Sequence, residues 1–176
     1  GGAKFMVEEG VMNNPKVDAI FGLHAWPGKV GTVEYRSGPT MAAAERMRIT
    51  VTGSQTHGAV PWKGVDPIAI SSQIITALQT IVAREVNITQ VPAVVTIGSI
   101  HGGVRNNIIP EEVVMEGTIR TFNDEVRKDI HDSIRKKAEM IASASGATAK
   151  VEIFSDIAKV TFNDPSLTDK IVPSLE

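Results

Sequence analysis

The sequence predicts an α+β fold. We expect a ferredoxin-like βαββαβ domain, with a four-stranded antiparallel sheet and two helices on one face, and stubs of a host α/β domain at both ends. Some segments alternate apolar and polar residues, as half-buried strands do, and others repeat apolar residues at spacings of three and four, as amphipathic helices do. Between residues 45 and 156 these segments follow the order strand, helix, strand, strand, helix, strand.

The residues before this domain predict part of another one. Residues 3–12 favour a short helix, and 18–26 are largely apolar, which indicates a well-buried strand. Residues 30–37 favour a second strand, while the small residues of 37–44 are typical of a linker or a domain boundary. The two strands would need a further sheet on which to rest.

The first strand and helix of the βαββαβ unit flank a loop. Residues 45–52 alternate with a period of two and predict a half-buried strand, and 53–67 are crowded with turn residues. A helix follows over 66–84, with Asp66 as its N-cap and Pro67 at its first position. Its apolar face consists of Ile70, Ile74, Leu78 and Ile81.

The second half repeats the pattern. We expect a strand over 94–100, a loop over 101–110 and a strand over 113–120. A helix then begins at Asn123-Asp124 and ends at Ser145-Gly146, and 149–154 form the last strand. Another helix begins near residue 165.

Composition narrows the possible partners. The 18 Lys and Arg residues against 20 Asp and Glu, with a pI near 6.1, argue against a nucleic-acid or anionic-membrane partner, which would favour a basic face. The absence of cysteine excludes disulfides and thiolate metal sites and fits a cytoplasmic location. No apolar run approaches the roughly 18 residues of a transmembrane helix.

Two histidines could carry chemistry. His24 ends the apolar segment 18–26, and ligands gather at the carboxyl ends of strands in α/β sheets, so it could bind a metal. On local sequence alone, a hydrogen-bonded core histidine is the favoured alternative. His57 lies in a loop stiffened by glycine and proline, where it could donate a hydrogen bond to an oxyanion or could simply brace the loop.

Three polar residues could bind a substrate. Asn106 and Asn107 follow two glycines in the loop 101–110 and could bind a carboxylate or an amide, although ordinary turn chemistry explains them as well. Arg120 lies on the polar face of its strand, where a guanidinium is suited to bidentate carboxylate recognition. An exposed ion pair is the alternative.

Three segments together resemble a known family. GLHAWP (22–27), GSQTHGAVPWKGVDPI (53–68) and GGVRNNIIPEEVVMEGTIRTF (102–122) closely resemble the aminoacylase, hippurate hydrolase and carboxypeptidase family of metal-dependent amidohydrolases. The branch that hydrolyses N-acyl amino acids is the most similar. The resemblance implies a catalytic domain that binds one or two divalent metal ions, Zn or else Mn, Co or Ni, and an inserted lid domain that also dimerises.

The resemblance assigns a role to each candidate residue. His24 matches a metal ligand, and His57 matches the lid histidine that reaches into the partner subunit's active site and stabilises the oxyanion. Asn107, with Asn106, matches the asparagine that contacts the substrate, an N-acyl amino acid or a small peptide. Arg120 matches the arginine associated with the substrate carboxylate.

The resemblance also divides the chain. It implies that residues 1–40 are part of the catalytic α/β domain, 41–158 the lid and dimerisation domain, and 159–176 the start of the returning catalytic segment. Glu8-Glu9 does not fit the family's acidic pair, and one histidine cannot hold a zinc ion that needs about three protein ligands. We therefore expect a fragment that alone binds no metal tightly and hydrolyses nothing.

Two other functions stay open at this stage. A free-standing ferredoxin-like module could bind RNA, but it would need exposed aromatic residues and a basic face. A purely structural interaction domain would be favoured if His57 were buried. For a dimer, the expected surface is the edge strand 93–97 with the helix 66–84.

Overall fold

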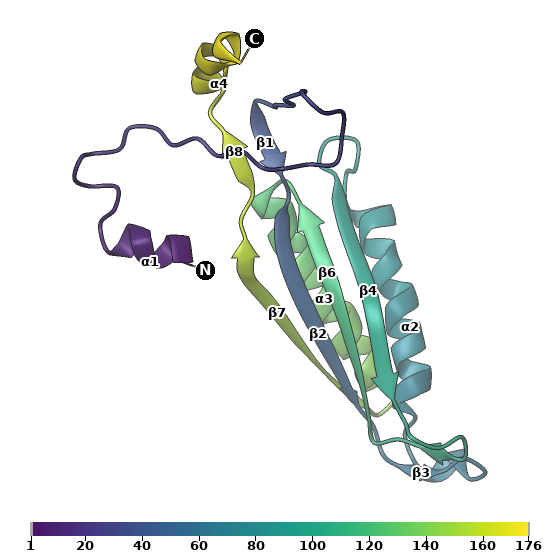
Figure 1. Ribbon diagram of the computed structural model, residues 1–176. Coiled ribbons are helices and arrows are strands. Elements are labelled where there is room, and N and C mark those ends of the chain that lie inside the picture. Colours follow the sequence, from purple (N-terminus) through teal and green to yellow (C-terminus); the bar gives the residue numbers. More distant parts are fainter. Residues whose placement is uncertain (1, 176) are drawn as a thin grey trace.

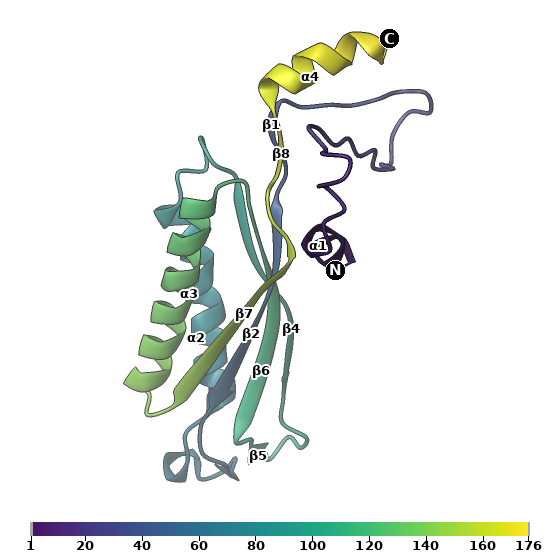
Figure 2. The same ribbon diagram turned by 90° about the vertical axis from the view of Figure 1, so that its left-hand side faces the viewer.

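The molecule is built on one antiparallel sheet with two helices on one face (Figures 1 and 2). The computed structural model describes residues 2–175, except for the side chains of Asp156 and Ile157. The strand order is β4-β6-β2-β7, which confirms the predicted fold class. The elements are β2 (Ala43–Thr52), β4 (Ala93–Gly102), β6 (Glu112–Thr121), β7 (Thr148–Ala158), α2 (Pro67–Thr80) and α3 (Asp124–Ala144).

The core lies between the sheet and the two helices. Alternate side chains of β2 and β6 point toward the helices, because successive residues of a strand face opposite sides. These side chains pack against the apolar faces of α2 and α3. The fully buried members include Met47, Ile49, Val51, Ile74, Leu78, Met115, Ile119, Ile130 and Ile134.

Both long helices begin at the predicted caps. The Oδ1 atom of Asp66 accepts hydrogen bonds from the backbone N–H groups of Ile68 and Ala69, at 2.8 and 3.3 Å. Asn123 caps α3 in the same way. Each cap satisfies amide groups that have no partner inside the helix. Within the described part of the chain, no helix combines the length and the apolar content that crossing a membrane requires.

A π-helical turn, Ile81–Glu85, extends α2 and is tied to α3. The Nζ atom of Lys137 lies 2.9 Å from Oε1 of Glu85, and this hydrogen bond lowers the pKa of Glu85. The contact therefore joins the C-terminal end of the α2 segment to the middle of α3.

The segments that enter and leave the sheet lie side by side. β1 (Gly38–Met41) pairs antiparallel with β8 (Thr161–Asn163). α4 (Pro165–Ile171), with the 3-10 turn Val172–Ser174, lies beyond this ribbon, whereas α1 (Gly2–Glu8) lies lower, to one side, level with the junction between the ribbon and the sheet (Figure 2). The segment 37–44, expected to be a linker or a domain boundary, contains a strand over Gly38–Met41, because β8 gives these residues a partner.

The two strands expected over 18–26 and 30–37 are absent from the structure, so that prediction was wrong. A strand is stable only beside another strand, and no segment among residues 2–175 pairs with either of them. Their apolar side chains stay in solvent: Leu23 is 90% exposed and Val30 is 97% exposed.

At the opposite end of the sheet, two loops meet in a short ribbon. β3 (Thr56–His57) pairs antiparallel with β5 (Ile108–Ile109), and the 3-10 turn Pro61–Lys63 lies beside them. We call this end, formed by residues 53–66 and 102–111, the tip. Figure 1 shows the tip at the end of the sheet away from β1 and β8.

Candidate functional site

The loop that carries His57 is closed into a ring at its base. The N–H group of Ser54 donates to the carbonyl oxygen of Val65 at 2.9 Å, and the N–H group of Val65 donates to that of Ser54 at 3.0 Å. A Cβ atom at Gly53 would clash with the Val65 carbonyl, and one at Gly64 would clash with the Ser54 carbonyl. The two glycines therefore permit the close approach that closes the loop.

His57 is exposed on this closed loop and lies beside the asparagine loop. His57 pairs with Ile108 across the β3–β5 ribbon, and the N–H group of Gly58 donates to the carbonyl oxygen of Asn107 at 2.8 Å. The Nδ1 atom of the His57 ring accepts a hydrogen bond from the N–H group of Ala59 at 3.1 Å. Among the described residues, nothing is hydrogen-bonded to its Nε2 atom.

Asn106 and Asn107 are both exposed at the tip. Within residues 2–175, their side-chain amides make no hydrogen bond. An unengaged amide can donate and accept at once, so it suits a ligand that carries both a carbonyl and an N–H group. The structure thus brings His57, Asn106 and Asn107 to one end of the sheet.

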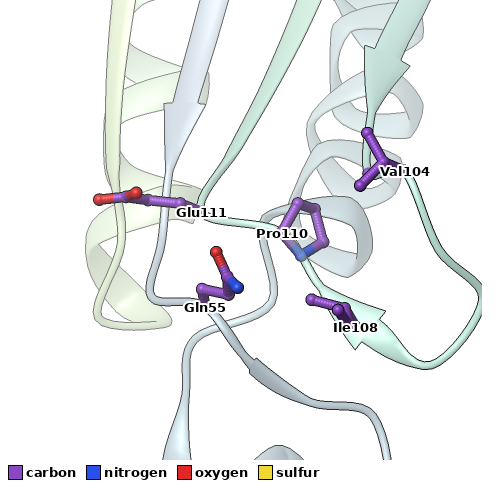
Figure 3. A pocket seen from close by; sticks show the side chains of 6 residues that line it. Gln55, Val104, Ile108, Pro110 and Glu111 are labelled. Atoms are coloured by element: carbon purple, nitrogen blue, oxygen red, sulfur yellow. The ribbon is translucent and has the colours of Figure 1, made fainter.

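A shallow cavity of about 180 Å³ opens next to this ribbon. Figure 3 shows the side chain of Gln55 in it near Pro110 and Ile108, whereas the carboxylate of Glu111 points away from them. Ligand pockets are commonly about 300–1,000 Å³, so this depression would hold only part of a small ligand. Its lining residues are Gln55, Gly103, Val104, Ile108, Pro110 and Glu111.

Arg120 lies at the other end of the sheet. It is near the C-terminal end of β6, a strand of 10 residues, which extends about 30 Å at roughly 3.3 Å per residue. Its Nη1 atom donates to the carbonyl oxygens of Glu45 and Ile119 at 3.1 and 2.9 Å. One chain alone therefore does not bring Arg120 and His57 together.

His24 lies in the exposed N-terminal segment rather than at the end of a strand. Its Nδ1 atom is 2.7 Å from the carbonyl oxygen of Ala25, and its ring stands edge-on to Trp26. Among the described residues, no three potential metal-binding side chains gather. Since a zinc site needs about three protein ligands, the described residues do not by themselves form a metal site.

One cluster of charged residues escaped the sequence reasoning. Glu45 is 1% exposed, and its Oε2 atom lies 2.6 Å from Nε2 of His131. Its Oε1 atom is 3.5 Å from Nη1 of Arg127, which also contacts Asp124 at 3.0 Å. One signal in the sequence could have indicated this cluster: Glu45 occupies an inward-facing position in the alternating pattern of β2. The cluster joins α3 to β2. The backbone carbonyl of Glu45, in the same strand, accepts the hydrogen bond from Arg120.

The outer face of the sheet carries opposite charges in pairs. Arg48 and Glu116 lie 2.6 Å apart, and the hydrogen bond from Arg48 lowers the pKa of Glu116. Lys150 and Glu152 lie 2.9 Å apart on the neighbouring strand. The two charges of each pair neutralise one another, while Arg46, which lies over the Phe154 ring, and Arg120 also occupy this face.

Many unrelated proteins share a four-stranded antiparallel sheet with two helices on one face, so the class of protein rests on comparison with known families. A family model described as a peptidase dimerisation domain matches residues 44–145. The chain belongs to the M20 family of peptidases and amidohydrolases.

Individual relatives support the same family membership. The chain is 40% identical to thermostable carboxypeptidase 2 of Saccharolobus solfataricus over 99% of its own length and 44% of that protein. It is 42% identical to N-acetyl-L-cysteine deacetylase of Bacillus subtilis over 95% of the chain and 39% of the relative. A crystal structure of a dinuclear metal-binding M20 peptidase from B. subtilis superposes with a TM-score of 0.76 at 34% identity, over 98% of this chain and 42% of that one. The chain thus spans less than half the length of the relatives it matches.

Proposed function

We propose that this chain is the lid and dimerisation region, with flanking pieces of the catalytic domain, of a metal-dependent amidohydrolase. The enzyme would cleave the linear amide bond of N-acyl amino acids or small peptides. The single observation that carries the proposal is the exposed His57 on a closed loop, beside two unengaged asparagine amides. A histidine that only braced the loop would be expected to be packed against it.

The division of the chain at about residues 40 and 158 stays part of the proposal. The β1–β8 ribbon begins just outside the four-stranded sheet and supports a boundary there. The apolar residues before it, such as Leu23 and Val30, are exposed, which supports their packing against parts of the catalytic domain outside this chain. A cytoplasmic location fits the absence of cysteine.

We assign the metal to the complete catalytic domain, of which this chain holds only a part. The relative described as a dinuclear metal-binding peptidase supports a divalent metal, with zinc our first choice and Mn, Co or Ni the alternatives. His24 would supply one ligand, and residues outside this chain would supply the others. The chain alone is therefore expected to be inactive.

The geometry favours a site shared between two subunits. Arg120 lies at the end of β6 that pairs with the start of β2, next to β1, whereas His57 lies in the β3–β5 ribbon at the opposite end of the sheet. We propose that the tip of one subunit enters the active site of its partner. There, His57 would donate a hydrogen bond to the oxyanion, Asn106 and Asn107 would contact the substrate amide, and the partner's own arginine would bind the substrate carboxylate.

The proposed dimer surface combines the free edge of β4 with α2. Among the residues that the structure describes, β4 pairs only with β6, so its other edge can accept a strand. No residue from Pro67 to Ala83 is charged, whereas α3 carries many charges. An exposed helix face without charges is typical of an interface. The exposed residues of α2 are Ile68, Ala69, Ser72, Gln73, Thr76, Gln79 and Thr80.

Ser72→Arg is expected to weaken this dimer by about tenfold or more, because the two-fold axis would bring unpaired like charges together across the interface. Analytical ultracentrifugation over a concentration series measures the dissociation constant. Ser143→Arg, at an exposed serine of α3, is the matched control and should leave the dimer intact. Equal effects of the two substitutions would rule out α2 as the interface.

Mixing two inactive variants of the whole enzyme tests the shared site. His57→Ala lacks the tip histidine, and His24→Ala lacks a metal ligand. Co-expressed, they should recover about a quarter of wild-type activity, since half of random dimers are mixed and each has one complete site. If His57 served its own subunit, the mixture would stay inactive. A His24→Ala variant that kept its metal and activity would contradict the role given to His24.

A further inference from the structure

We propose that the closed loop holds His57 in a single tautomer, with its proton on Nε2, so that the tip presents a fixed hydrogen-bond donor. The positioning group is the backbone N–H of Ala59. The tautomer itself follows from the loop geometry, whereas the oxyanion as the target of the donor rests on the proposed function.

The hydrogen bond to Nδ1 determines where the ring proton lies. The Ala59 backbone nitrogen lies 3.1 Å from Nδ1 of His57, and a backbone N–H can only donate. Nδ1 must therefore accept. A neutral imidazole has one N–H group and one acceptor nitrogen, so its proton must be on Nε2.

The backbone around the ring keeps the Ala59 amide in place. The N–H group of Val60 donates to the carbonyl oxygen of His57 at 2.9 Å, which closes a tight turn. The N–H group of Gly58 donates to Asn107 on the neighbouring loop, and a Cβ atom at Gly58 would lie 3.3 Å from the Asn107 backbone. The Ala59 amide is thus held by hydrogen bonds from the residues on both sides of it, Gly58 and Val60.

This tautomer limits what His57 can do. With Nδ1 engaged by Ala59, the only nitrogen left for a ligand is Nε2, and it already carries a proton. A neutral ring in this state cannot accept a proton at Nε2 and cannot bind a metal through it. The tip therefore offers an electrophilic donor rather than a general base or a metal ligand.

Nitrogen-15 NMR of the 176-residue chain tests the tautomer directly, without any need for activity. At a pH where the ring is neutral, we expect a pyrrole-type Nε2 resonance and a pyridine-type Nδ1 resonance for His57. Single His→Gln variants at His24, His57, His101 and His131 assign the signals. A pyrrole-type Nδ1, or averaged nitrogen shifts, would overturn the proposal and leave the complementation test of the proposed function unaffected.

A matched pair of variants tests the positioning role of Ala59. Ala59→Pro removes the N–H group, whereas Ala59→Gly keeps it. The proline variant should show averaged His57 nitrogen shifts and, in the whole enzyme, a kcat lower by about three- to tenfold, the factor for one hydrogen bond. The glycine variant should keep the wild-type spectrum. Wild-type nitrogen shifts in a folded proline variant would contradict the role of Ala59. If that variant does not fold, the spectrum of the wild-type chain alone decides whether His57 has its proton on Nε2.

Discussion

Replacing His57 by alanine in the whole enzyme is expected to lower kcat about 10²–10³-fold while metal content stays unchanged. The ring is exposed at the tip, and among the described residues its Nε2 atom has no hydrogen-bond partner. A donor that meets charge developing in the transition state acts on kcat more than on substrate binding, because the ground-state carbonyl carries less charge.

Steady-state kinetics on an N-acyl amino acid and metal analysis of the same preparation measure this effect. His101→Ala is the matched control, since His101 is also exposed and lies at the end of β4 that leads to the tip. It should retain nearly full activity. Loss of metal in His57→Ala would show instead that His57 is a ligand, and an unchanged kcat would remove it from the reaction.

Replacing Glu45 by alanine is expected to lower the free energy of unfolding by about 3 kcal/mol. The substitution leaves Arg127 and His131 without their buried partner. We expect the lower end of the range for broken buried ion pairs, because these two side chains keep 17% and 14% of their surface exposed.

Urea unfolding of the chain, followed by circular dichroism, measures the loss. Glu116→Ala is the matched control: Glu116 pairs with Arg48 on the exposed face of the same sheet, and a solvent-exposed pair contributes little. Glu45→Gln should fall between the two, because glutamine keeps hydrogen-bonding atoms but loses the charge. Equal midpoints for Glu45→Ala and Glu116→Ala would contradict a stabilising role for the cluster.

Much of the fold could be predicted from local sequence. The alternation in β2 and the spacing of Ile70, Ile74 and Leu78 depend only on which neighbouring side chains must be buried together. The caps at Asp66 and Asn123 are likewise local, since each side chain bonds backbone groups two and three residues ahead.

The errors concern pairing between distant segments. Residues 18–26 are apolar enough for a buried strand, yet burial needs a partner that this chain does not supply. Gly38–Met41 has the composition of a linker but becomes a strand because Thr161–Asn163 lies beside it. Intrinsic preference does not decide such cases, because a strand is stabilised mainly by its neighbours.

For the candidate site, too, the sequence determined some features and the tertiary structure decided others. Sequence alone determined the fold class, the family resemblance and the residue types that could act, among them His57, Asn107 and Arg120. Only the tertiary structure decided that His57 and Asn107 meet at the tip, that Arg120 lies at the far end of β6, and that Glu45 is buried against α3. The physical reason is that strand pairing and helix docking depend on contacts between residues far apart in the chain, which local preference does not decide.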